Sequence, residues 1–158
     1  MIILGIDPGT QRIGYGIIDV YKNKPSFKTA GILKIKKKGF LVLKESKKEI
    51  DKLILKWKPK ILAIEKLYFS KNQKTAMSVS EIRGIIILSA LEKNIKIMEY
   101  SPNEIKLLIT GYGFSDKKAV AKMVNLILNL KNKNFIDDAT DAIALSLVAA
   151  QNLKSIDN

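Results

Sequence analysis

The spacing of hydrophobic positions changes along the chain, and each spacing predicts a type of element. An apolar run over residues 1–7 ends at Asp7 before a Pro-Gly-Thr turn sequence, which predicts a buried strand. Residues 13–20 alternate in part and predict a second strand, and residues 26–36 predict a third. The Lys-Asn-Lys-Pro segment at 22–25 is typical of a hairpin turn. Three successive strands favour an antiparallel meander.

From residue 40 the spacing becomes helical. Apolar side chains fall on one face of the predicted helix and lysines on the other, so the apolar face is expected to pack inward. The apolar set is Phe40, Leu43, Ile50, Leu53, Ile54 and Trp57. Pro59 ends this helix, and the short apolar run at 61–65 predicts a buried strand of the parallel kind.

The second half of the chain predicts mainly helices. A long helix is expected over 73–92, a strand over 95–98, and a helix that begins at the Ser-Pro-Asn-Glu capping box of 101–104. Gly111 and Gly113 end that helix, Ser115 or Asp116 caps the next one, and a last helix covers 138–151. The inward side chains of the capped helix are Val120, Met123, Val124, Ile127 and Leu130. The order βββαβαβααα predicts one α/β domain over residues 1–158, with a mixed five-stranded sheet flanked by helices.

Composition narrows the class of protein. A chain of 158 residues suits one hydrophobic core. No apolar run approaches the ~18 residues of a membrane span. The N-terminus lacks the features of a signal peptide, so Met1 is expected to begin the mature fold. The absence of cysteine excludes disulfides and fits a cytoplasmic location.

Charge and the missing histidines point to a partner and a metal. Lysine and arginine number 28 against 15 acids, a net charge of +13 that attracts polyanions. Genome composition or solubility is the alternative explanation of this excess. With neither histidine nor cysteine, any metal must be held by oxygen, which favours Mg²⁺ or Mn²⁺ over Zn²⁺.

Four acids differ from the others, which lie among lysines. Asp7 and Glu65 each end an apolar strand, and Asp138 and Asp141 open a strongly apolar helix from one face. A carboxylate at the end of a buried strand is costly to desolvate unless a cation meets it. Capping of the last helix by Asp137 or Asp138 explains at most two of these acids.

A convergence of the four carboxylates would create a metal site. Their mutual repulsion is relieved by divalent ions, which can bridge a scissile phosphate, activate a water and stabilise the leaving 3′-oxygen. Surrounding lysines would bind the flanking phosphates. The pattern therefore predicts hydrolysis of phosphodiesters without a covalent intermediate.

Several motifs resemble those of the RuvC family of Holliday-junction resolvases, over residues 2 to 150. The family's opening is similar to Gly5-Ile6-Asp7-Pro8-Gly9-Thr10 with Gly14-Tyr15-Gly16. Further likenesses are Ala63-Ile64-Glu65 with Lys71-Asn72 and Arg83-Gly84, and finally Asp138-Ala139-Thr140-Asp141-Ala142. The resemblance implies an RNase H-like fold and paired, symmetric nicking of four-way DNA junctions in recombination and repair.

The resemblance also implies the parts of the site. Asp7, Glu65, Asp138 and Asp141 take the positions of the family's metal-binding tetrad, which uses Mg²⁺, with Mn²⁺ as a substitute and two ions expected for each site. The enzyme is expected to be a homodimer and to work with the RuvA–RuvB branch-migration complex.

Four DNA-binding residues and a dimer helix follow from the same resemblance, each with an alternative. Lys106 and Lys117 match basic positions near the family's active site, or are ordinary helix-surface lysines. Tyr68 stands where the family often has Phe and stacks on opened bases, or is a core aromatic; Lys71 follows it in the same loop. The helix at 73–92 forms the twofold interface through small residues such as Gly84, or packs within the chain.

Three other functions compete with a junction nuclease. A sugar-kinase or Hsp70-like ATPase also begins with a strand ending in Asp-x-Gly-Thr, but it needs two such lobes and this chain has no repeat. A non-catalytic nucleic-acid binder would lack some of the four acids. An RNase H that cuts RNA–DNA hybrids would share the fold and the metals.

Overall fold

The structure, a computed structural model, describes residues 1–67, 73–130 and 135–154. Over these residues the chain forms five strands and five helices in the predicted order βββαβαβααα. The strands are β1 (Ile2–Asp7), β2 (Arg12–Tyr21), β3 (Lys24–Lys34), β4 (Ile61–Glu65) and β5 (Lys96–Tyr100). The helices are α1 (Leu41–Trp57), α2 (Gln73–Leu91), α3 (Pro102–Thr110), α4 (Lys117–Ile127) and α5 (Asp137–Lys154).

The strands form a mixed sheet in the order β3-β2-β1-β4-β5, which confirms the predicted architecture. The meander β1-β2-β3 is antiparallel, whereas β4 and β5 run parallel to β1. Lys22 and Asn23 turn the chain between β2 and β3 with φ values of 46° and 60°. Two successive positive φ values are those of the type I′ turn that matches the twist of a hairpin.

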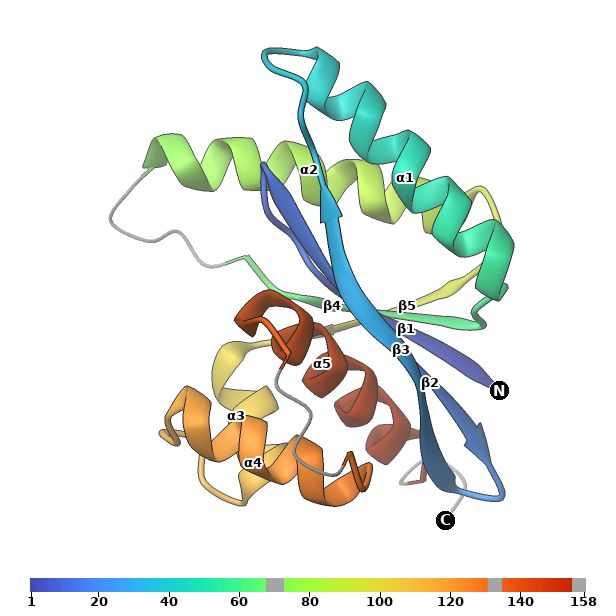
Figure 1. The fold of residues 1–158 in the computed structure, drawn as a ribbon, viewed down its shortest axis with the longest axis vertical. Coiled ribbons are helices and arrows are strands. Elements are labelled where there is room, and N and C mark those ends of the chain that lie inside the picture. Colours follow the sequence, from blue (N-terminus) through green and yellow to red (C-terminus); the bar gives the residue numbers. More distant parts are fainter. Residues whose placement is uncertain (68–72, 131–134, 155–158) are drawn as a thin grey trace.

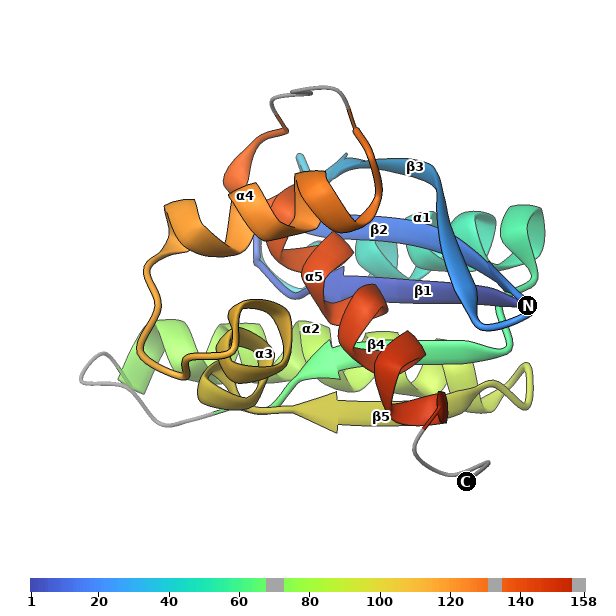
Figure 2. The same ribbon diagram turned by 90° about the horizontal axis from the view of Figure 1, so that it is seen from below.

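Helices cover both faces of the sheet in a three-layer arrangement (Figure 1). The helices α1 and α2 lie on one face and α3, α4 and α5 on the other, as the second view also shows (Figure 2). Each face has its own hydrophobic cluster because side chains alternate along the strands. None of the helices in the described part of the chain is long and apolar enough to span a membrane.

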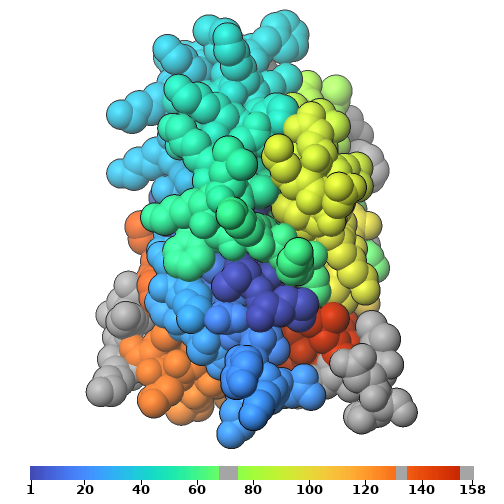
Figure 3. All heavy atoms as spheres, turned by 90° about the vertical axis from the view of Figure 1, so that its right-hand side faces the viewer, coloured from blue at the N-terminus to red at the C-terminus, as the bar shows by residue number. Residues whose placement is uncertain are grey.

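The two ends of the sheet differ in what gathers there. Figure 3 shows the end where β1 begins, with the N-terminal residues between the β2–β3 hairpin and the segment that joins α1 to β4. The carboxyl ends of β1, β4 and β5 lie together at the other end because these strands are parallel. That end carries the residues with candidate chemistry.

Helix starts follow the predicted capping signals, with one correction. The Ser101 capping box is present, and Asp116 caps α4 by accepting the Ala119 N–H at 2.7 Å. Phe40 was expected on the inward face of its helix, and this is wrong. It is the N-cap residue of α1, before the first helical turn, and its side chain is 87% exposed. The helical spacing cannot show that the helix begins one residue later.

Candidate active site

The two strand-end acids are brought together by the parallel pairing of β1 with β4. Ile6 and Ile64 are partners in that register, so Asp7 and Glu65 follow them at the same edge of the sheet. Both carboxylates are half-buried. The carboxyl ends of adjacent parallel strands thus place two acids side by side, as the sequence predicted.

Two glycines bring the start of α5 onto this edge. Gly14 pairs with Asp7 across β1 and β2, and a Cβ at Gly14 would collide with the backbone carbonyl of Asp138. A Cβ at Gly5 would collide in the same way with the carbonyl of Ala142. Glycine in a strand permits such close approach of another backbone. The first turn of α5 therefore rests directly beside Asp7.

The other three acids all act on the charge of Asp7. Burial and, in decreasing order, the negative charges of Asp141, Glu65 and Asp138 together raise the pKa of Asp7 to about 7, while Lys117 opposes them. The free carboxylic acid has a pKa of 3.8. Buried carboxylates that repel one another favour protonation or a bound cation. Glu65 and Asp141 share one pocket with Asp7, and Asp138 lines an adjoining hollow with Asp7, so Asp7 is the acid that the other three surround.

Glu65 is affected in the same direction by its surroundings. Burial raises its pKa, Asp141 raises it further, and the ammonium groups of Lys117 and Lys106 lower it. One pocket of about 360 Å³ is lined by three of the acids, Asp7, Glu65 and Asp141, and by both of these lysines. Two predicted DNA-binding lysines are therefore inside the candidate site, although their role in binding DNA stays a prediction.

Local capping holds these lysines in place. The carboxylate of Glu104 accepts the Ser101 N–H at 2.7 Å, which fixes the start of α3 and hence Lys106. The cap at Asp116 makes Lys117 the first helical residue of α4. From there the Lys117 ammonium donates to the Asp141 carboxylate at 3.0 Å.

Both arginines of the chain also touch this site, and sequence reasoning gave neither a role. The Nε of Arg12 lies 3.1 Å from the Asp138 carboxylate. The Nε of Arg83 donates to the Glu65 backbone carbonyl at 3.2 Å, and its guanidinium pairs with Glu99. Arginine suits such places because its planar group serves several acceptors at once.

The donor set fits a hard divalent cation that would have to draw the acids closer. Over the described ranges, with 68–72, 131–134 and 155–158 left aside, no three acids form a ready metal-ligand group. Asp141 and Asp138 are paired with Lys117 and Arg12, which keeps part of the charge neutralised. Oxygen ligands of this kind are those that Mg²⁺ and Mn²⁺ prefer. Two further predicted site residues, Tyr68 and Lys71, lie outside the described residues.

A mixed sheet of this order, with acids at the ends of its central strands and on the first turns of α5, has the architecture of the RNase H-like nucleases. Comparison with known proteins gives the family. The sequence profile described as "Crossover junction endodeoxyribonuclease RuvC" matches residues 3–149. The chain therefore belongs to the RuvC family of crossover junction endodeoxyribonucleases.

Curated relatives agree with this assignment, and a solved structure agrees with the fold. The RuvC crossover junction endodeoxyribonuclease of Fusobacterium nucleatum is 42% identical over 98% of this chain and 83% of its own length. The protein of the same name from Pseudothermotoga lettingae is 41% identical over 92% of this chain and 91% of its own. The fold matches Thermus thermophilus RuvC in complex with Holliday junction substrate, with a TM-score of 0.90, 24% identity, and coverage of 98% and 96% of the two chains.

Proposed function

We propose that this chain resolves four-way DNA junctions by Mg²⁺-dependent hydrolysis, with Asp7, Glu65, Asp138 and Asp141 holding two ions in each active site. The observation that carries the proposal is the placement of Glu65, Asp141 and Asp138 in hollows that Asp7 also lines, where they and burial raise the pKa of Asp7 to about 7. A group of acids that the neighbouring lysines and Arg12 neutralise only in part favours a divalent cation. Relatives at 41–42% identity carry the name crossover junction endodeoxyribonuclease, which supports the junction as the substrate.

The residues of the chain would divide the work of cutting. Bound Mg²⁺ would supply a Lewis acid that activates a water and stabilises the leaving 3′-oxygen. Lys106 and Lys117 on the pocket wall would bind the phosphates next to the cut, and Ile105 and Val120 would limit access of bulk water. The chain has no histidine to act as a base.

A cleavage assay on matched substrates tests this function. Wild-type protein should cut a synthetic four-way junction only with Mg²⁺ or Mn²⁺, and should leave plain duplex and RNA–DNA hybrid intact. Asp7→Asn should bind the junction but lose cutting, because one metal ligand is lost while the basic surface stays. Asp51→Asn is the matched control, since Asp51 pairs with Lys47 on α1 outside the pocket. Preference for the hybrid, or normal cutting by Asp7→Asn, would refute the proposal.

The proposal includes a homodimer with α2 at its twofold axis. Met77, Leu88 and Leu91 are 66%, 45% and 57% exposed on one stripe of this helix. A Cβ added at Gly84, on the same stripe, would meet nothing within 4 Å. An exposed apolar stripe with a small residue at its centre suits close contact with a second copy.

Oligomeric state tests the dimer directly. Met77→Glu should convert the dimer to monomers in sedimentation experiments and uncouple the two nicks of one junction. Leu55→Glu is the control, because Leu55 is also exposed, at 60%, but lies on α1. Equal behaviour of the two variants would argue against α2 as the interface.

The proposal extends to recombination and repair in the cytoplasm with the family's RuvA–RuvB complex, and the lack of cysteine is consistent with a reducing compartment.

A further inference from the structure

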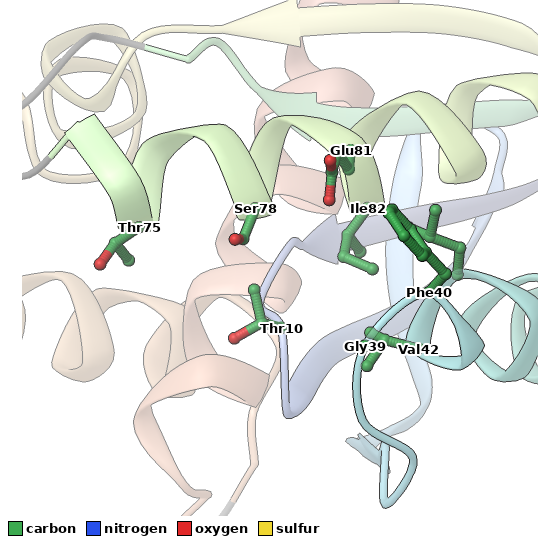
Figure 4. A pocket seen from close by; sticks show the side chains of 9 residues that line it. Thr10, Gly39, Phe40, Val42, Thr75, Ser78, Glu81 and Ile82 are labelled. Carbon is green, nitrogen blue, oxygen red and sulfur yellow. The ribbon is translucent and has the colours of Figure 1, made fainter.

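A second hollow, here named the Phe40 groove, is drawn in Figure 4 with the side chains that line it. Its volume is about 470 Å³, within the range of about 300–1,000 Å³ that is typical of small-molecule sites. The side chains that matter for its chemistry are Thr10, Phe40, Thr75, Ser78, Glu81 and Ile82. In Figure 4, Thr75, Ser78 and Glu81 extend from α2 toward the side that holds Thr10 and Phe40.

The Phe40 groove adjoins the active site at Thr10. This residue also lines a smaller hollow of about 260 Å³, which contains Asp7, Arg12 and Asp138. Asp7 in turn lines the pocket that holds Glu65 and Lys117. A strand that is held at the carboxylates and passes over the β1–β2 turn would therefore reach the groove.

Phe40 is the most exposed large hydrophobic side chain among the described residues, at 87%. It precedes α1 rather than pointing into the core, so its ring contributes little to packing. An exposed phenylalanine that lines a largely apolar hollow with a few hydroxyls and one carboxylate offers an open face on which a planar group can stack. Stacking on aromatic side chains is how many proteins hold unpaired bases.

The charges around the Phe40 groove indicate separate places for a base and for phosphates. Lys36, Lys37 and Lys38 are exposed just before the groove, and the Glu45 carboxylate accepts the backbone N–H groups of the first two at 2.8 Å. This basic segment is thus held in place next to Phe40. Inside the groove, Glu81 repels phosphate but can accept hydrogen bonds from the amino group of a base.

We infer that the Phe40 groove takes an unstacked base from the junction strand that is being cut, with the ring of Phe40 stacked against it and Lys36–Lys38 on the adjoining phosphates. The inference rests on the proposed function, because it needs a junction bound at the carboxylates. It assigns a contact for DNA away from the pocket that holds Lys106 and Lys117.

A double-mutant cycle between protein and DNA tests the stacking. The probes are synthetic four-way junctions, each with a single abasic nucleotide at one position near the cut. Junction affinity is measured in an Asp7→Asn background, and single-turnover cutting in the otherwise wild-type chain. Phe40→Ala should weaken binding of the intact junction by about 5- to 100-fold. On the one junction whose abasic site removes the stacked base, Phe40→Ala should cause no further loss of affinity.

Two control variants distinguish loss of stacking from the removal of any exposed hydrophobic side chain. Leu41→Ala changes the next residue, which is 56% exposed but does not line the groove, and should bind every junction as wild type does. Phe40→Trp should keep the affinity, because the larger ring can still stack.

Each outcome decides between the two proposals. Wild-type protein that neither binds nor cuts the junction overturns the proposed function and this inference with it. Normal cutting with Phe40→Ala equal to Leu41→Ala overturns the inference alone. An equal loss on all abasic junctions would mean contact with the backbone, and dissociation of the dimer by Phe40→Ala would mean contact with a second copy; both overturn it.

Discussion

The two faces of the sheet are packed by different means. On the face of α1 and α2, large side chains such as Leu4 and Ile6 fill the space and are fully buried. On the face of α5, Gly5 and Gly14 leave room for the helix backbone itself to touch the strands. Side chains can adjust to one another, whereas backbone contact leaves little freedom. The face with the acids is thus the face where a helix is positioned most precisely.

Gly14→Ala should have the largest effect, and on cutting rather than on folding. The added methyl must push the Asp138 backbone away from Asp7, and displacement of a reacting group by about 1 Å can cost about 100-fold in rate. The free energy of unfolding should fall by about 1–3 kcal/mol, as in other overpacked cores. Single-turnover cutting of a junction and urea unfolding measure the two effects. A stable variant that cuts at the wild-type rate would show that α5 is not positioned through this contact.

Ile86→Ala, on the other face, should mainly lower the free energy of unfolding and should leave cutting almost unchanged. Ile86 of α2 is fully buried in the cluster with Leu4 and Ile6. Its truncation leaves a cavity and should lower the free energy of unfolding by about 2–5 kcal/mol. Cutting per folded molecule should stay near the wild-type rate, because α2 supplies none of the four acids. Ile86→Val, with an expected loss of about 0.5–1.5 kcal/mol, keeps the test valid if the alanine variant unfolds.

The same contrast explains what the sequence could and could not predict. The spacing of apolar residues was enough to single out Asp7, Glu65 and the start of α5, because each is a local pattern. In the two strands an acid follows the apolar run, and in α5 acids precede it. The contacts of Arg12 and Arg83 were not predictable, since they depend on pairing between elements far apart in the chain. The exposure of Phe40 was missed because its spacing fits a helix that in fact begins at Leu41.

Asp7→Asn in the presence of EDTA should reveal a destabilising charge on the α5 face. The pKa of Asp7 is about 7 in the folded protein and 3.8 for the free group, so between these values the folded protein binds the extra proton. Stability from this group is therefore present below about pH 4 and is lost as pH rises to about 7. The variant should match wild type at pH 4 and exceed it at pH 8 by roughly 1–3 kcal/mol after solvent screening.

Urea titrations at several pH values measure this difference. Saturating Mg²⁺ should reduce it for wild type, because ligand binding to the folded state stabilises that state. Asp51→Asn should show no such pH-dependent gain. Equal stabilities of wild type and Asp7→Asn at pH 8 would mean that Asp7 is not under electrostatic strain.

The buried serines give the smallest and most selective comparison of the two faces. Within the described part of the chain, the hydroxyls of Ser46 and Ser89, on α1 and α2, are buried without a hydrogen-bond partner. On α5, by contrast, Ser146 donates to the Ile143 carbonyl at 2.7 Å. Ser89→Ala should raise the free energy of unfolding by about 1 kcal/mol, because a buried unpaired hydroxyl is removed and alanine favours the helix. Ser146→Ala loses a hydrogen bond and should give no gain. Equal stabilisation by both substitutions in urea titrations would mean that helix propensity alone explains the gain and that the two faces do not differ in this respect.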